Sequence, residues 1–456
     1  MTTTRPVRYS ARWVLPATSA PIERGAVLVI DGRIAAVGPA ASVPLPDGGE
    51  DLHLGEAVLL PGLVNVHAHP ELSLLRGALE DLPFHLWIPR LRQLKAAAVL
   101  SPDDLRDAAR WTLAECAAAG VTTVGATEDS DASLHALRDA GMRGIVYREV
   151  FSPAPADATS ALQGLRDNVS AMRTLETELV RVGVSPHAPY SVSDALFTAV
   201  ARFAHEQSLP VAVHTAESAT EQELVTSGDG FFANALRARG IETVARGAST
   251  IDMLQRTGIL DLAPLLIHCV RVSADDIAMI VSAGASVAHC PVANARLGHG
   301  IAPITELMTA GAVVGIGTDS VASNNRIDML EEARVAQLMQ RARLGSPDVL
   351  PTHALLRLVT IDGARALGLD DVTGSLEIGK DADLCAVALD GIHSVPIFDP
   401  VGTLFMSASA SDVVLTAVRG RVIYRRGVES TLATATLATR MDVLGTRVRV
   451  AAASET

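Results

Sequence analysis

The sequence predicts a (β/α)8 barrel joined to a small β-sandwich that is assembled from both ends of the chain. Two observations lead to this prediction. Between residues 61 and 371, short apolar runs alternate with amphipathic stretches of helical periodicity, as in strand–helix units around a parallel barrel. At both ends, short β-rich runs separated by turns replace this alternation. We therefore expect residues 1–60 and 372–456 to form the composite sandwich with a C-terminal tail, and residues 61–371 to form the barrel.

The N-terminal part contains two short β-rich runs, over 7–16 and 26–38, and Asp31-Gly32 in the second is typical of a hairpin turn. Strands this short cannot bury a core by themselves. Comparable runs occur near the C-terminus, over 383–389, 412–418 and 421–424. We therefore expect the two ends of the chain to pair with each other.

Eight strands are expected in the central region, each followed by a helical stretch. They cover residues 63–67, 121–125, 143–150, 181–185, 210–214, 265–268, 285–289 and 313–317. Ser101-Pro-Asp-Asp104 is a capping box with proline at the first helical position. Ser193, Ser273 and Asp328 begin further helices in the same way. A doubly wound sheet is the alternative, but it would need an early glycine-rich phosphate turn, which is missing here.

Composition and net charge limit the classes of function that suit this chain. The chain has 456 residues, 48% of them hydrophobic and 20% charged, and a net charge of −13 at pH 7, which indicates a globular protein and disfavours nucleic acid as a partner. No apolar run is suited to span a membrane, and the first residues lack the apolar core of a signal peptide. The cysteines, which suit a reducing compartment, are Cys116, Cys269, Cys290 and Cys385. We expect a cytoplasmic enzyme with a small-molecule substrate, assembled as a homo-oligomer such as a dimer.

Polar residues of metal-binding type stand at the ends of the predicted strands. His67 and His69 close the first strand, where alternation points both side chains to the same side. Later strands are closed or followed by His187, His214, His268 and Asp319. Catalytic groups of a (β/α)8 barrel lie at the carboxyl ends of its strands. Because packing alone does not explain so many such residues at one end, we predict a metal site there.

These segments resemble the amidohydrolase superfamily, in particular its branch of mononuclear deaminases and chlorohydrolases. The resemblance covers nearly the whole chain, and the motifs occur in the order of the family. The matching segments are Pro61-Gly-Leu-Val-Asn-Val-His-Ala-His69, Leu74-Leu-Arg-Gly77, Ser185-Pro-His-Ala-Pro-Tyr190, His214-Thr-Ala-Glu217, His268-Cys-Val, Asn294-Ala-Arg-Leu-Gly-His-Gly-Ile-Ala-Pro303, Gly317-Thr-Asp-Ser-Val-Ala-Ser-Asn-Asn325 and Gly374-Ser-Leu-Glu-Ile-Gly-Lys-Asp-Ala-Asp-Leu384.

The resemblance implies a site for one divalent metal ion. Binuclear members of the superfamily bridge two ions with a carboxylated lysine on the fourth strand. This chain has only two lysines, Lys95 and Lys380, and neither lies on that strand, which is followed by His187 instead. The implied ligands are His67, His69, His214 and Asp319. Three nitrogens and one carboxylate suit Zn²⁺, and these ligand types also allow Fe²⁺.

By the same resemblance, Glu217, His268 and Asp319 are the catalytic residues of a hydrolytic deamination. Metal binding lowers the pKa of water from about 16 to about 7, which makes hydroxide accessible at neutral pH. Glu217 would carry a proton from that water to a ring nitrogen of the substrate. His268 would hydrogen-bond the attacking oxygen, and Asp319 would deliver a second proton to the departing amine.

Four residues are expected to contact the substrate: His187, Trp87, Arg148 and Glu149. His187 shares the barrel mouth without a metal role, and Trp87 lies in the loop after the first strand. Arg148 and Glu149 come at the end of the third strand. The resemblance implies an aminated heterocycle as substrate, above all the adenine of a nucleoside in the methylthioadenosine, adenosylhomocysteine and aminodeoxyfutalosine deaminase group.

One departure from this group bears on the substrate. Adenosylhomocysteine-type enzymes carry a glutamate for the ribose hydroxyls well after the first-strand histidines, and the segment Arg92-Gln-Leu-Lys-Ala-Ala-Ala98 has none. The stretches 218–262 and 148–153 are more similar to aminodeoxyfutalosine-type members. The alternatives are a triazine-type chlorohydrolase or aminohydrolase and a guanine or pterin deaminase. A non-catalytic scaffold would have lost metal ligands that this chain retains.

Overall fold

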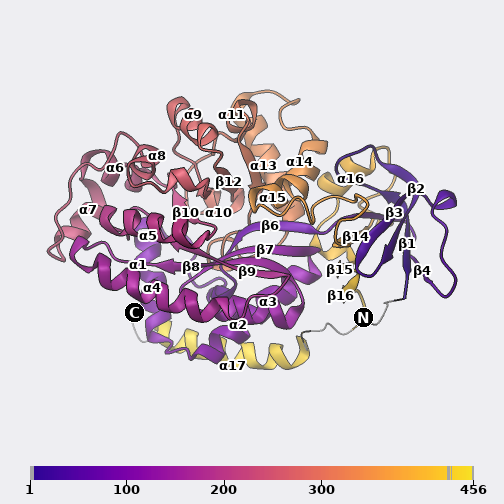
Figure 1. Ribbon diagram of the computed structural model, residues 1–456, viewed down its shortest axis with the longest axis horizontal. Helices are drawn as coiled ribbons and strands as arrows, with labels where there is room; N and C mark the ends of the chain where they lie inside the picture. Colours follow the sequence, from indigo (N-terminus) through magenta and orange to yellow (C-terminus); the bar gives the residue numbers. More distant parts are fainter. Residues whose placement is uncertain (1–4, 429–431, 433, 454–456) are drawn as a thin grey trace.

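The computed structural model describes residues 5–428, 432 and 434–453, and it places a strand-rich sheet beside a barrel (Figure 1). The barrel consists of two four-stranded parallel sheets, ordered β6-β7-β8-β9 and β10-β11-β12-β13. Its strands are β6 (Leu63–Ala68), β7 (Val121–Glu128), β8 (Arg143–Val150), β9 (Val180–Pro186), β10 (Ala212–Thr215), β11 (Leu265–His268), β12 (Ser286–His289) and β13 (Val313–Ile316). All residues of β6 and β7 are buried, as expected of parallel strands covered on both faces.

The two halves of the barrel meet at two parallel bridges. Val184 of β9 bridges Val211, which comes just before β10, and Ala68 of β6 bridges Asp319, which follows β13. At the second seam the Asp319 amide also donates to the His67 carbonyl at 3.0 Å. The predicted (β/α)8 arrangement is thus confirmed, and its seams bring strand ends from both halves together.

Helices surround the barrel, and their caps lie where the sequence predicts them. Ser101 and Asp104 form the capping box of α2, while Ser193, Ser273 and Asp328 accept backbone hydrogen bonds at the starts of α5, α9 and α13. The helices up to α16 are α1 (Phe84–Ala97), α2 (Pro102–Ala118), α3 (Ala132–Ala140), α4 (Ala158–Arg173), α5 (Asp194–Gln207), α6 (Ala219–Ser227), α7 (Gly230–Arg237), α8 (Thr250–Arg256), α9 (Ala274–Ser282), α10 (Pro291–Arg296), α11 (Ile304–Ala310), α12 (Val321–Asn324), α13 (Met329–Leu344), α14 (Thr352–Leu358), α15 (Ile361–Ala366) and α16 (Pro400–Met406).

Strands from both ends of the chain form one eight-stranded sheet, in the order β16-β15-β14-β5-β1-β2-β3, with β4 paired to β1. The sandwich expected from the two termini therefore takes the form of one continuous sheet. Strand β5 joins the two ends, because it pairs with β1 on one edge and with β14 on the other. The bounds are β1 (Val7–Val14), β2 (Ile22–Ile30), β3 (Arg33–Pro39), β4 (Glu50–His53), β5 (Ala57–Pro61), β14 (Leu384–Ala388), β15 (Val413–Val418) and β16 (Arg421–Arg425).

A buried ion-pair group connects this sheet to the barrel. Arg143, at the start of β8, donates to Asp381 at 2.7 Å and to Asp383 at 2.9 Å, just before β14. All three side chains are buried. Removing one partner of such a group leaves an uncompensated buried charge, which is strongly destabilising.

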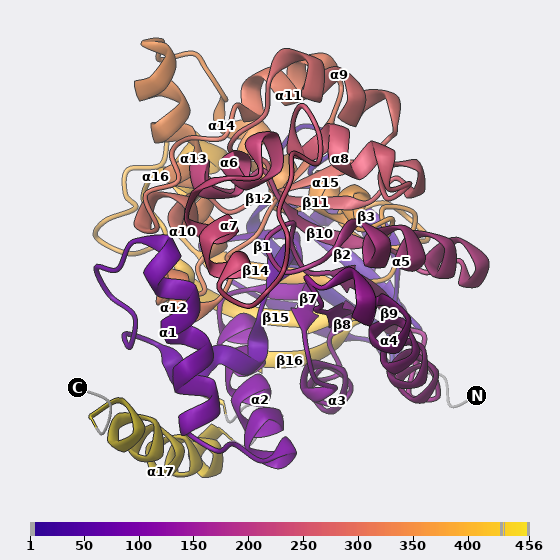
Figure 2. The ribbon, with the colours of Figure 1, turned by 90° about the vertical axis from the view of Figure 1, so that its left-hand side faces the viewer.

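The C-terminal tail forms a long helix, α17 (Thr434–Ala453), which the sequence does not predict. It lies along α1 and α2 (Figure 2). Leu444 and Val448 belong to the same apolar cluster as Trp87 of α1, and Arg447 donates to Asp104 at 2.8 Å. The helix has few buried side chains, so its hydrophobic periodicity is weak.

All four cysteines are buried, and none of them is bonded to another. Among the described residues, no helix is both long and apolar enough to cross a membrane.

We predict that a fragment ending at residue 372 is insoluble. It lacks β14, so β5 loses its antiparallel partner and Arg143 loses both carboxylates. An unpaired strand edge favours aggregation. Solubility after expression and circular dichroism test this, and a stable, active fragment would show that the C-terminal strands are dispensable. The domain boundaries at residues 60 and 371 stay a prediction until then.

Candidate metal centre

Four donor side chains converge at the carboxyl end of the barrel. His67 lies on β6, His69 follows it, His214 lies on β10, and Asp319 comes three residues after β13. His69 Nε2 is 3.3 Å from His214 Nε2, and Asp319 Oδ1 is 3.4 Å from His67 Nε2 and 3.6 Å from His69 Nε2. Ligand atoms about 2.0–2.1 Å from one tetrahedral ion lie roughly 3.3 Å apart. The spacing therefore fits a single divalent ion.

The environment keeps these ligands in the protonation states that a metal ion needs. Burial lowers the pKa of His69 to about 3 and the pKa of His214 well below its ordinary value, so both rings are neutral at pH 7. Burial alone would raise the pKa of Asp319, but the neighbouring imidazoles hold it below its usual range. His67 Nε2 is buried and has no hydrogen-bond partner in the part of the chain that the structure describes. Neutral imidazoles, an ionised carboxylate and one unpartnered ring nitrogen fit a metal ion.

Neighbouring groups orient the ligands. The Nδ1 atom of His214 donates to the His187 carbonyl at 3.1 Å, which leaves Nε2 for the ion. Asp319 has a left-handed backbone, with φ of +58°, and its two oxygens accept from Ser320 N at 2.7 Å and Ser323 Oγ at 2.8 Å. Such contacts fix the tautomer and direction of metal ligands.

Glu217 and His268 lie beside the four ligands. His268 ends β11, and its Nε2 is 3.4 Å from Glu217 Oε1; both residues are buried. Burial acts to raise the pKa of Glu217, but His268 and His299 outweigh it and hold the pKa below its ordinary value. The carboxylate form of Glu217, which can accept a proton, is therefore the stable one. His268 Nδ1 lies 2.9 Å from Asn294 Oδ1, so the neutral ring presents Nε2 as an acceptor.

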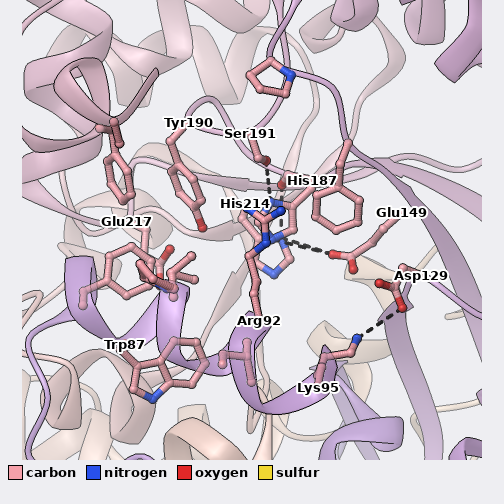
Figure 3. A pocket seen from close by; sticks show the side chains of 18 of the residues that line it. Trp87, Arg92, Lys95, Asp129, Glu149, His187, Tyr190, Ser191, His214 and Glu217 are labelled. Carbon is pink, nitrogen blue, oxygen red and sulfur yellow. Dashed lines mark hydrogen bonds and ion pairs between the residues drawn. The ribbon is translucent and has the colours of Figure 1, made fainter. Parts of the chain in front are cut away.

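A cavity of about 1000 Å³ opens over the ligands. Figure 3 shows His187, His214, Glu149 and Glu217 around it, with Arg92 and Lys95 extending from α1. Its apolar wall comes mainly from α1, α7 and the loops at the barrel mouth. The large apolar lining residues are Leu72, Phe84, Trp87, Ile88, Leu91, Phe151, Tyr190, Phe231, Phe232, Leu236 and Leu297.

Three of the four expected substrate contacts line this cavity, namely Trp87, His187 and Glu149. Glu149 Oε1 lies 4.0 Å from His187 Nε2, and burial is the main cause that raises the pKa of Glu149 well above its ordinary value. Arg148 is not among the lining residues. Successive side chains of a strand point to opposite faces, so β8 cannot turn both Arg148 and Glu149 into the cavity. Arg148 therefore lies outside the lining of this cavity, and its role as a substrate contact stays a prediction.

Sequence reasoning missed two groups. Lys95 of α1 lies 2.9 Å from Glu71 Oε1 and 3.2 Å from Asp129 Oδ1, and all three residues line the cavity. No spacing rule connects them, because they come from three separate segments. His299 lies 3.1 Å from Glu217 Oε1; its place between two glycines in the segment 294–303 is the only local signal for it.

Comparisons with known proteins agree with this geometry. Residues 58–423 match the amidohydrolase family. A 5-methylthioadenosine/S-adenosylhomocysteine deaminase from Moorella thermoacetica is 32% identical, over 92% of this chain and 94% of that protein. An adenosine deaminase from Xanthomonas campestris, solved with bound zinc, has a TM-score of 0.82 and 29% identity, covering 97% of this chain and 98% of that one.

A third known protein is similar to this chain in its fold. The zinc complex of atrazine chlorohydrolase from Arthrobacter aurescens has a TM-score of 0.80 at 23% identity, covering 96% of this chain and 100% of that one. The family match and the 32% identical relative show that the chain belongs to the amidohydrolase family. The four donor side chains at the barrel rim agree with this assignment.

We predict about one equivalent of divalent metal per chain. His67→Ala and Asp319→Ala should each lower metal content and abolish activity, because each removes a ligand from the set. Elemental analysis of wild type and variants tests this. His135→Ala, a change on the outer helix α3, is the control and should retain the metal. Two equivalents per wild-type chain would contradict the single-ion site.

Proposed function

We propose that the chain is a metal-dependent deaminase that hydrolyses the amino group of an adenine ring in a 5′-modified nucleoside, the methylthioadenosine, adenosylhomocysteine or aminodeoxyfutalosine class. The observation that carries the proposal is the buried, ionised Glu217 beside a complete set of metal ligands. The relative named as a 5-methylthioadenosine/S-adenosylhomocysteine deaminase supports the substrate class.

Each residue has a separate task in this reaction. His67, His69, His214 and Asp319 would hold the metal ion, which would supply the nucleophile by lowering the pKa of a water molecule. Glu217 accepts a proton and delivers it to a ring nitrogen, which makes the neighbouring carbon more electrophilic. His268, whose Nδ1 is occupied by Asn294, accepts a hydrogen bond from the attacking oxygen through Nε2. The Asp319 carboxylate receives a second proton and passes it to the leaving amine.

The cavity suits a nucleoside with an extended substituent. At about 1000 Å³ it lies at the upper end of the range of drug-sized ligand sites, roughly 300–1,000 Å³. Trp87, Tyr190 and Phe232 provide aromatic surfaces for the ring and substituent. Asp129 lines the cavity, and its side chain is 45% exposed. Its carboxylate could therefore accept hydrogen bonds from the ribose hydroxyls, in place of the glutamate that adenosylhomocysteine-type enzymes use.

The aminodeoxyfutalosine-type alternative has one structural support. Phe231 and Phe232 belong to the long segment 218–262, and both reach the cavity, where they would contact an aromatic 5′ substituent. A triazine-type chlorohydrolase would use the same metal ligands, and a guanine or pterin deaminase would leave the outer part of the cavity empty. Release of chloride would distinguish the chlorohydrolase from a deaminase. Ammonia release from a free base that carries no sugar would identify the guanine or pterin deaminase.

The ion, assembly and compartment are further parts of the proposal. Zn²⁺ is favoured over Fe²⁺ because three imidazoles and one carboxylate in close spacing suit tetrahedral zinc. Four free, buried cysteines suit a reducing cytoplasm. A homodimer is supported by exposed apolar side chains such as Ile392 and Phe398, since exposed apolar surface often marks an interface; light scattering tests it.

We predict that Glu217→Gln retains metal and substrate but loses roughly two to four orders of magnitude in kcat, the usual share of a general acid–base group. The amide keeps the shape of the side chain and cannot carry the proton. Ammonia release by the zinc-loaded protein measures the rate, and elemental analysis shows that the ion is kept. Turnover near the wild-type rate would remove Glu217 from the mechanism.

We predict that His187→Ala raises KM more than it lowers kcat. His187 lines the cavity, and Ser191 Oγ lies 2.6 Å from its Nδ1. We therefore assign His187 the role of positioning the heterocyclic ring of the substrate. Steady-state kinetics with methylthioadenosine and adenosylhomocysteine tests this. A large loss of kcat with unchanged KM would assign His187 to the chemical step instead. If no aminated heterocycle yields ammonia, the deaminase proposal fails and the chlorohydrolase is favoured.

A further inference from the structure

A second imidazole lies on the proton-carrying glutamate. His299 Nε2 is 3.1 Å from Glu217 Oε1, and His268 Nε2 is 3.4 Å from the same oxygen. We propose that His299 is a positioning residue that holds Glu217 as a carboxylate and anchors its Oε1, so that Oε2 carries the proton to the substrate. This inference deepens the proposed deaminase function and rests on it.

The two histidines are not equivalent toward Glu217. The Nδ1 atom of His268 lies 2.9 Å from the Asn294 side-chain oxygen and donates its hydrogen there. A neutral imidazole has one N–H and one lone pair, so His268 then presents a lone pair at Nε2 and cannot donate to Glu217. His299 Nε2 is buried and lies 3.1 Å from Oε1 without a formed hydrogen bond among the described residues, so it is left as the group that can turn an N–H toward Oε1. A hydrogen bond to the charged form of a carboxyl group stabilises that form.

The backbone holds His299 in this position. It lies between Gly298 and Gly300, which have φ of +71° and +111°, values that residues with a Cβ rarely adopt. The His299 amide donates to the Asn294 carbonyl at 2.9 Å, and the ring meets Phe84 edge-on at 4.6 Å between centroids. Asn294 thus orients both histidines that contact Glu217, one through its side chain and one through its backbone.

The charges around Glu217 make its ionisation depend on these imidazoles. Burial and the Asp319 carboxylate act to raise its pKa, whereas positive charge on His268 and the His299 ring beside Oε1 act to lower it. Because His268 is held neutral, the His299 ring is the partner on which the carboxylate depends. Burial also raises the pKa of Glu221 on α6 to about 8, and that carboxyl accepts from Ala216 N at 2.7 Å. The other titratable groups that interact with Glu217 are Tyr190, His187 and Cys290. Loss of His299 should therefore raise the pKa of Glu217.

The direction of the resulting pH dependence follows from the role of Glu217. The reaction needs its carboxylate, whose fraction falls as pH drops through its pKa. A higher pKa moves the acid limb of kcat/KM to higher pH. We expect His299→Leu to shift this limb upward by roughly one pH unit or more and to lower kcat about 10- to 100-fold with little change in KM. His299→Gln keeps a neutral N–H donor and should largely restore both.

The experiment uses zinc-loaded full-length protein with methylthioadenosine, and follows ammonia release across pH. His85→Leu is the matched control, because His85 lines the same neighbouring cavity of about 480 Å³ as His299 while its ring packs against Phe231. It should keep the wild-type pH profile. Zinc content should be unchanged in all three variants, since none of them removes one of the four metal ligands.

A double substitution isolates the route through Glu217. If His299 acts through that carboxylate, Glu217→Gln combined with His299→Leu should be no slower than Glu217→Gln alone. Additive losses, or a wild-type acid limb in His299→Leu, would overturn the inference. If His299→Leu loses zinc or does not fold, His299→Gln serves as the test. An acid limb of kcat/KM that is shifted to higher pH in His299→Gln would overturn the inference. Wild-type protein that releases no ammonia from any nucleoside would instead refute the proposed function.

Discussion

The buried carboxylate of Asp319 is the group on which the rest of the site depends. Its backbone joins the last barrel strand to the first, through the bridge to Ala68 and the hydrogen bond to the His67 carbonyl. Its side chain faces the His67 and His69 rings. A buried carboxylate is unfavourable unless it is paired and hydrogen-bonded, and Ser320 and Ser323 supply those hydrogen bonds. Closure of the barrel and formation of the metal site are thus one structural event.

Chemistry and substrate binding are carried by different parts of the molecule. The proposed metal ligands and proton-transfer groups lie on strand ends or in the few residues that follow them. The walls of the cavity come largely from α1 and α7. Lys95 ties α1 to Glu71 and Asp129 at the barrel rim, and α17 packs against the outside of α1. Substitutions in those helices can therefore change which substrate binds without changing the residues proposed to hold the ion.

Much of this arrangement could be predicted from the sequence, because strand alternation and barrel topology constrain both the position and the direction of a side chain. His67, His69, His214 and Asp319 follow that rule, and the structure brings them within contact distance. The same alternation shows why only one of Arg148 and Glu149 can line the cavity. Which of the two does so depends on the register of β8, which the sequence does not state.

The remaining features depend on contacts between distant segments. His299 meets Glu217, and Lys95 meets Glu71 and Asp129, through loop conformations that no local pattern encodes. Helix α17 buries few of its side chains, so periodicity does not reveal it. The continuous sheet at the chain ends results from β5 pairing on both edges, a choice that short β-rich runs leave open.

The most direct test is to titrate zinc into metal-free protein and to measure ammonia released from methylthioadenosine or adenosylhomocysteine at each step. We expect no release without metal, and a linear rise that stops at one equivalent of zinc per chain, because one set of four ligands serves one ion. A rise that continues to two equivalents, or fully loaded protein that releases no ammonia from either nucleoside, would contradict a single-ion deaminase site.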